Sequence, residues 1–205
     1  MERRRSQREL AQSLLRERGI LRLVELREAG VTAATMSRME RAGEVIRLSR
    51  GVYQLPDAEL DPNHSLAEAA KRVPKGVICL VSALAFHGLT DQLPSKVWMA
   101  IGTKDWSPQR DGTPIRIVRF TDNLLKEGFE THVIEGVVVK VFSAARTVAD
   151  CFRHRSKVGL PVAIEGLQEA LRQRKATPAE IARQADKRGV LTVIRPYLEA
   201  LTANG

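Results

Sequence analysis

Between positions 32 and 50 the chain carries arginine and hydroxyl side chains whose types and spacing could bind nucleic acid. Arg38 and Arg41 lie three residues apart, and Arg47 and Arg50 follow in a stretch that contains glycine. A guanidinium group can form two parallel hydrogen bonds with a guanine edge or with a phosphate. These residues therefore predict contacts with DNA, provided that the local structure brings them to one surface.

The elements that must position them are two short helices. Apolar residues at helical spacing over residues 20–29 predict the first helix, and Gly30 ends it because glycine tolerates the left-handed backbone of a helix exit. Thr32 is predicted to cap a second helix over residues 33–42, since its hydroxyl can accept a hydrogen bond from a free backbone amide. This second helix is expected to bury Met36 and Met39 and to present Ala33, Ser37, Arg38 and Arg41 outward.

A β-hairpin is predicted directly after the second helix. Beyond Gly43 the apolar period changes to two over residues 46–49, and residues 52–55 return across a turn that contains glycine. Arg47 and Arg50 would lie on this hairpin beside the DNA backbone, where contacts fix the register without reading sequence. Two helices followed by such a wing predict a winged helix-turn-helix domain over residues 1–56.

The charge of the chain agrees with a nucleic-acid partner. The net charge is +9, and residues 1–55 hold 12 Lys and Arg against 7 Asp and Glu. Arg3, Arg4, Arg5 and Arg8 predict either a basic arm that follows phosphates or an ordinary solvated terminus. Phosphate contacts of this kind would make the affinity for DNA fall steeply with salt.

The two cysteines and the hydropathy exclude several classes of protein. Cys79 and Cys151 lie far apart in apolar surroundings and lack the spacing of a zinc site, so we expect reduced core residues and no metal or other cofactor. No stretch has the length and apolar character of a membrane span, and no apolar core of a signal peptide follows the basic N-terminus. We therefore expect a cytoplasmic protein with no membrane partner.

A second domain is predicted after a proline-bracketed acidic linker at residues 57–64. Ser65 and Glu68 suggest a capping box for a helix over 66–73, and residues 77–81 read as a buried strand or the lead into a helix. Strands are predicted over residues 97–101, 115–120, 132–135 and 137–142, and helices over 144–155, 162–174, 178–187 and 190–201. The fold class is therefore α+β, with a small antiparallel sheet packed by helices over residues 65–205.

The residues of this second domain do not form the pattern of an active site. His87 follows Ser82 without a nucleophile elbow, and Arg146 and Asp150 have the spacing of an i,i+4 ion pair. Nothing in the sequence places two of the loop aspartates within metal-bridging distance; these are Asp91, Asp105, Asp111 and Asp122. We therefore assign no catalytic residues and predict that the protein is not an enzyme.

Three segments carry a resemblance to a known family. Residues 30–53 resemble the N-terminal domain of AbiEi-type antitoxins, and residues 80–94 and 143–152 resemble the C-terminal domain of the same family. The resemblance implies a transcriptional autorepressor and antitoxin of a type IV toxin-antitoxin system. Its implied partners are double-stranded promoter DNA and a nucleotidyltransferase-like toxin, and its implied state is a monomer or a cooperative assembly on DNA.

By matching position, the resemblance extends to the arginines of the helix and the wing. The predicted recognition helix begins with alanines, so base reading would rest on Thr35, Ser37 and Arg38. The candidate DNA-binding residues are Thr32, Thr35, Ser37, Arg38, Arg41, Arg47 and Arg50. Two alternatives stay open, a winged-helix repressor whose second domain senses a small ligand and a metal-dependent DNA-processing enzyme.

Overall fold

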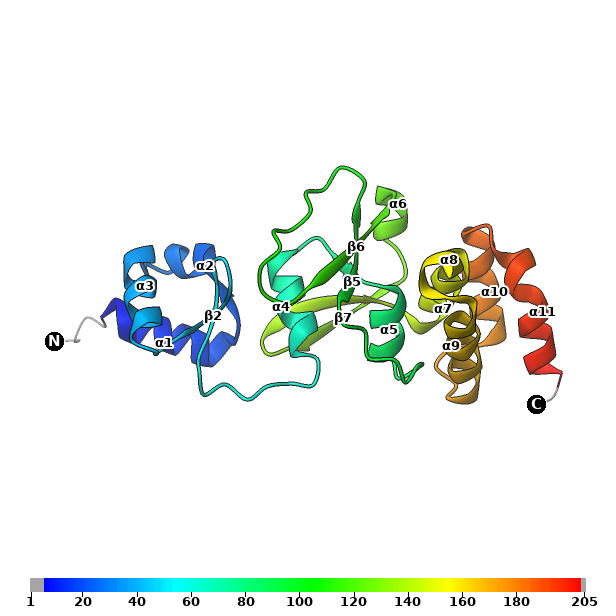
Figure 1. The fold of residues 1–205 in the computed structure, drawn as a ribbon, viewed down its shortest axis with the longest axis horizontal. Helices are drawn as coiled ribbons and strands as arrows, with labels where there is room; N and C mark the ends of the chain where they lie inside the picture. The colour runs from blue at the N-terminus through cyan, green and yellow to red at the C-terminus, as the bar shows by residue number, and fades with distance from the viewer. Residues whose placement is uncertain (1–5, 204–205) are drawn as a thin grey trace. The chain divides into compact units, whose positions relative to one another are not determined.

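The computed structural model describes residues 6–203 and divides them into two units, each of which is treated by itself (Figure 1). The first unit comprises residues up to Lys75 together with 107–115 and 132–139. The second comprises 76–106, 116–131 and the chain from Lys140 onward. The sequence predicts a boundary at residues 57–64, whereas by contacts the chain up to Lys75 groups with the first unit.

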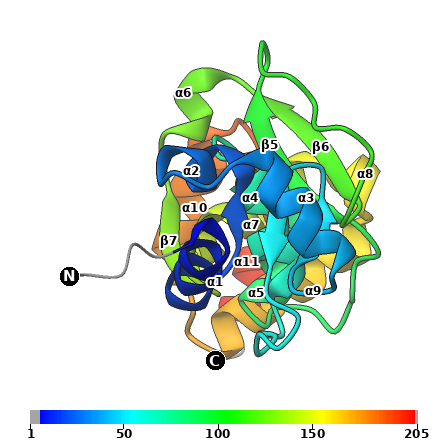
Figure 2. The ribbon, with the colours of Figure 1, turned by 90° about the vertical axis from the view of Figure 1, so that its left-hand side faces the viewer.

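The first unit contains a winged helix-turn-helix. Its helices are α1 (Gln7–Arg18), α2 (Leu23–Glu28) and α3 (Ala33–Arg41), which are labelled in Figure 2. Its small antiparallel sheet has the order β1-β3-β2, from β1 (Leu21–Arg22), β3 (Val52–Gln54) and β2 (Ile46–Ser49). The helices and the sheet enclose a core that includes Leu15, Leu26, Met36, Met39 and Tyr53.

Helix α1 contains Arg8, for which the sequence left open either a basic arm or an ordinary terminus. Ser6 caps it, because the Ser6 hydroxyl accepts from the Glu9 amide at 3.2 Å while the Glu9 carboxylate accepts from the Ser6 amide at 2.8 Å. Arg8 lies in the first turn and pairs with Glu44, so it belongs to neither of the two alternatives, an arm or an ordinary terminus, that the sequence left open. Arg3, Arg4 and Arg5 lie outside the described residues.

Helix α4 (His64–Arg72) and the tip of a hairpin complete the first unit. The predicted capping box of α4 does not form, since Asn63 is the N-cap and the Glu68 carboxylate accepts instead from the Thr113 amide at 2.9 Å. Glu135, at the hairpin tip, accepts from the Asp61 amide at 2.7 Å and lies 2.8 Å from His64 Nδ1. The acidic segment before α4 is therefore held by side-chain contacts.

Two glycines allow the hairpin tip to approach α1. Gly136 has a φ of +74°, and a Cβ there would overlap the backbone carbonyl of Arg18. Gly19 has a φ of +67°, and a Cβ there would overlap the carbonyl of Glu135. Because both backbones meet without side chains, each glycine is required by close packing as well as by its positive φ.

A five-stranded sheet with the order β6-β5-β4-β8-β7 forms the centre of the α+β part. Its strands are β4 (Val77–Ile78), β5 (Val97–Gly102), β6 (Ile115–Phe120), β7 (Phe129–Ile134) and β8 (Val137–Phe142). The α+β fold class is confirmed. The pairing differs from the expected antiparallel sheet at one place, because β4 runs parallel to β8 and antiparallel to β5. The residues of β4 and β8 are about sixty positions apart, so no hairpin signal specifies their pairing.

Helices cover the core of the second unit. They are α5 (Leu80–Phe86), α6 (Asp122–Leu125), α7 (Ala144–Arg153), α8 (Arg155–Val158), α9 (Leu160–Arg172), α10 (Pro178–Lys187) and α11 (Leu191–Thr202). Helix α7 packs against α5, α9 and α10, and its Val148 and Phe152 are fully buried (Figure 1). Thr177 caps α10 and forms a capping box with Glu180.

A buried ion network joins α7 to the residue that follows α10. Asp150 accepts from Arg146 Nε at 3.1 Å and from Arg188 Nε at 2.8 Å, and all three side chains are almost completely buried. The Arg146 guanidinium lies 3.3 Å from the ring centroid of Phe142. The predicted ion pair between Arg146 and Asp150 is confirmed, and it lies buried in the second unit.

The cysteines give a test of this core. Cys79 and Cys151 are fully buried, and burial raises the pKa of each thiol well above its usual value, with a further rise from the charge of Asp150. We expect no reaction of the native protein with an exposed-thiol reagent, because the reactive thiolate is neither formed nor accessible. Both thiols should react after unfolding in urea. Rapid labelling of the native protein would contradict this packing.

Candidate nucleic-acid interface

Helix α3 is fixed at its start by hydroxyl groups that face α1. The Thr32 hydroxyl accepts from the Thr35 amide at 3.2 Å, which is the predicted cap. Gln7 of α1 accepts from the hydroxyls of Thr32 at 3.0 Å and Thr35 at 2.7 Å. Thr35 is only 9% exposed, so its side chain holds α3 against α1 and is not presented to solvent.

The outer face of α3 presents the two predicted arginines. Arg38 and Arg41 are exposed, and Ser37 beside them is half-buried. Arg38 Nε donates to the Ala34 carbonyl and Arg41 Nε to the Ser37 carbonyl, each at 3.3 Å. Arg41 Nη2 also donates to the Ser37 hydroxyl at 3.4 Å, so these contacts of both side chains lie within α3. The exposed first turn consists of small residues, so the helix could approach a DNA groove closely.

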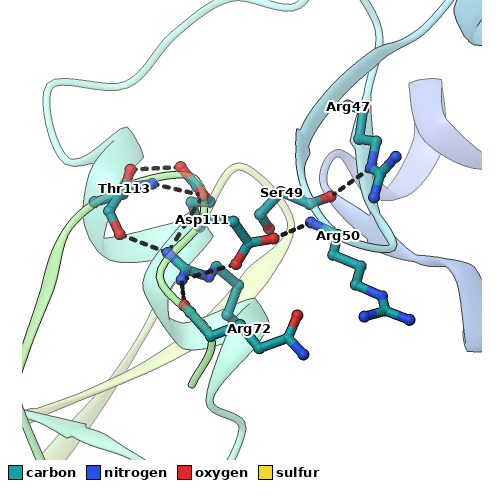
Figure 3. Close-up of polar contacts among 8 residues, drawn as sticks. Arg47, Ser49, Arg50, Arg72, Asp111 and Thr113 are labelled. Atoms are coloured by element: carbon teal, nitrogen blue, oxygen red, sulfur yellow. Dashed lines mark hydrogen bonds and ion pairs between the residues drawn. The ribbon is translucent and has the colours of Figure 1, made fainter. Parts of the chain in front are cut away.

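The wing carries Arg47 and Arg50, both of which are exposed. The register of β2 against β3 shifts between Arg47 and Ser49, which marks a bulge. Ser49, after the shift, is buried at 6% exposure, whereas Ile46, before it, is 45% exposed. Arg47 Nε donates to the Ser49 carbonyl at 3.3 Å, and this bond directs its side chain along the wing (Figure 3).

A basic hollow of about 550 Å³ lies beside the wing. Its cationic lining residues are Arg22, Arg47, Arg50, Lys71 and Arg72, and Asp111 is the acidic one within the described part of the chain. Asp111 accepts from the backbone amide of Arg50 at 2.5 Å and from Arg72 Nη2 at 3.3 Å, while the Arg50 guanidinium points away from it (Figure 3). The hollow thus combines positive side chains with a backbone donor.

Sequence reasoning missed three cations of this hollow. Arg22 precedes α2, and Lys71 and Arg72 end α4, where cations normally interact with the C-terminal dipole of the helix. Glu25 accepts from Lys71 Nζ at 3.0 Å and from the Arg22 amide at 2.8 Å. Burial opposes ionisation of Glu25, but these contacts outweigh it and lower its pKa. No local sequence signal joins α4 to the wing.

The residues considered for catalysis have structural contacts. His87 is the C-cap of α5, and its Nε2 lies 2.8 Å from the Phe142 carbonyl. Asp105 and Asp122 were expected to be scattered, yet both carboxylates lie against Gly102, and Asp105 accepts from the Gly102 amide at 2.9 Å. Within residues 6–203, no group of three or more His, Cys, Asp or Glu side chains is placed to hold a metal ion.

None of the described helices is both long enough and apolar enough to cross a membrane.

Comparison with known proteins identifies the N-terminal segment. Residues 8–56 match the family model described as "Transcriptional regulator, AbiEi antitoxin". No curated protein matches the chain. The fold is similar to that of the RV2827C protein from Mycobacterium tuberculosis, with a TM-score of 0.60 and 15% identity over 98% of this chain and 83% of the other. Residues 8–56, which contain the helix-turn-helix and the wing, are therefore similar to the transcriptional-regulator domain of AbiEi antitoxins, and this similarity supports a DNA-binding regulatory role.

Proposed function

We propose that this protein is a transcriptional autorepressor and the antitoxin of a type IV toxin-antitoxin system, acting in the cytoplasm on its own promoter. The observation that carries the proposal is the exposed pair Arg38 and Arg41 on a capped helix, next to a wing with Arg47 and Arg50. This arrangement lies within the segment that matches the AbiEi family.

In the proposed complex, α3 enters the major groove and the wing lies along the adjacent backbone. The small residues at the start of α3 allow close approach, and Arg38 and Arg41 are long enough to reach base edges. Thr32 and Thr35 act indirectly, since both hydroxyls bond to Gln7 and hold α3 in place. Base reading therefore rests on Ser37, Arg38 and Arg41.

The proposed target of the antitoxin activity is a nucleotidyltransferase-like toxin encoded beside this gene. The AbiEi match and the resemblance of residues 80–94 and 143–152 to the C-terminal domain of that family support this part of the proposal. Neutralisation in such systems is often indirect, so the proposal requires no stable complex between the two proteins.

Two readouts in cells test the proposal separately. A reporter driven by the DNA upstream of this gene should be repressed by the full chain, and substitution of Arg38 and Arg41 by alanine should relieve the repression because the base contacts are lost. Co-expression of the full chain with the neighbouring gene product should restore growth that the neighbour alone arrests. An unrepressed reporter would exclude the repressor, and growth arrest that persists would exclude the antitoxin.

A further inference from the structure

We propose that the basic hollow beside the wing binds a phosphate group of the DNA backbone, and that the Asp111 carboxylate occupies this place in the free protein. The inference rests on the DNA-binding function proposed above. It extends the contact surface beyond the winged helix to α4 and to the segment 107–115, none of which lies in the family match.

The charge of the hollow favours a phosphodiester. Five cationic side chains line it from β1, the wing and α4, against the single carboxylate of Asp111 among the described lining residues. Lys71 and Arg22 share Glu25, whereas Arg47 and Arg50 are exposed and form no ion pair with that carboxylate. Backbone phosphates are bound by such cations together with main-chain amides.

Ser49 gives an independent indication of a ligand. Its hydroxyl is buried, lines the hollow and has no hydrogen-bond partner among residues 6–203. A buried hydroxyl without a partner is unfavourable, because it loses its bonds to water without replacement. A phosphate oxygen in the hollow would supply the missing acceptor.

Asp111 already makes contacts of the kind that a phosphate would make. Its carboxylate accepts from the Arg50 amide at 2.5 Å and from Arg72 Nη2 at 3.3 Å (Figure 3). A main-chain amide and a guanidinium are also common donors to a backbone phosphate. The Asp111 carboxylate therefore occupies the place of a phosphate in the free protein, and a DNA phosphate must displace it from these donors.

The backbone around Asp111 lies very close to the wing. Gly112 has a φ of +62°, and a Cβ there would overlap the Glu68 carboxylate and lie 2.8 Å from the Leu48 carbonyl. Only glycine allows this close approach. Arg72 also donates to the carbonyls of Gln109, at 2.7 Å, and Thr113, so the segment stays anchored to α4 when the Asp111 side chain leaves.

Two substitutions with opposite effects test the proposal by titration of the full chain with duplex DNA from upstream of its gene. Asp111→Asn should bind about 3- to 10-fold more tightly, with a salt dependence steeper by about one counterion, because the competing carboxylate is gone. Ser49→Ala should bind about 5-fold more weakly because a donor to the phosphate is lost, and the free variant should be at least as stable as the wild type because an unpartnered hydroxyl is removed. Urea unfolding of each variant confirms that the fold is intact.

Asp57→Asn is the matched control, since Asp57 is an exposed acid of the same unit. If Asp111→Asn and Asp57→Asn have equal effects, only net charge matters and the proposal is overturned. Unchanged binding by Ser49→Ala also overturns it. These results leave DNA binding by the wild-type chain in place, whereas a wild-type chain that binds no DNA would refute the proposed function and this inference together. The same titrations are repeated with added inorganic phosphate. If the added phosphate abolishes the difference in DNA affinity between Asp111→Asn and the wild type, the hollow is a site for free phosphate, and a contact with the DNA backbone is contradicted.

Discussion

Substitution of Arg38 and Arg41 by alanine is expected to weaken sequence-specific DNA binding by about 2 to 6 kcal/mol, because each bidentate contact with a base contributes about 1 to 3 kcal/mol. This loss corresponds to a change in Kd of about 30-fold or more. Both side chains are exposed and bond only within α3 among the described residues, so the fold should persist. A gel-shift titration with upstream and scrambled DNA measures the effect.

The matched control for this pair is the substitution of Arg183 and Arg195 by alanine. Both residues are exposed on helices of the second unit, and their removal changes the net charge by the same amount. We expect this control to lower the affinity for both DNAs slightly and equally. If the control loses as much specific binding as the α3 variant, the arginines of α3 contribute only general charge.

Asp150→Ala is expected to destabilise the second unit by about 3 to 5 kcal/mol, because it leaves two buried guanidinium groups without their shared carboxylate. Burial lowers the pKa of Arg146, and the charge of Asp150 opposes this shift. Trp98 is buried in the same unit and reports its unfolding, so urea titration followed by tryptophan fluorescence measures the loss.

Asp186→Ala controls for the removal of a carboxylate, since Asp186 is exposed on α10. We expect a change of less than about 0.5 kcal/mol in this variant. An Asp150→Ala protein as stable as the Asp186→Ala protein would mean that the buried network contributes nothing to the fold.

The helix-turn-helix and the wing could be predicted because their signals are local. Thr32 caps α3 through an amide three residues away, and Met36 and Met39 follow the helical period into the core. The turn of the hairpin at Glu135 and Gly136 is also local, since both residues take positive φ values. In such segments the residues that determine the conformation are neighbours in the chain.

Other features of the first unit depend on contacts between distant residues. Strand β1 has only two residues and exists because Leu21 pairs with Tyr53. The sequence predicts that Thr35 reads bases, but Gln7 binds it from α1, a helix that is not predicted from the sequence. The capping box of Ser6 and Glu9 was a readable signal for that helix.

The hollow beside the wing could not be predicted for the same reason. Asp111 contacts Arg50 across 61 positions of sequence, and Arg72 reaches the same carboxylate from α4. Glu68 has the spacing of a capping residue, yet the Thr113 amide and hydroxyl bind it in the folded chain. A side chain whose spacing is typical of a helix cap thus binds instead to the segment 107–115, which comes close to it only in the folded protein.

The central claim is sequence-specific DNA binding by the N-terminal domain. The most direct test titrates the full chain with duplex DNA from upstream of its own gene and with a scrambled duplex, each at two salt concentrations. The account predicts tighter binding to the upstream DNA, with a preference that survives at the higher salt, because base contacts depend less on counterion release than phosphate contacts do. Equal binding to both duplexes that collapses together at the higher salt would contradict it.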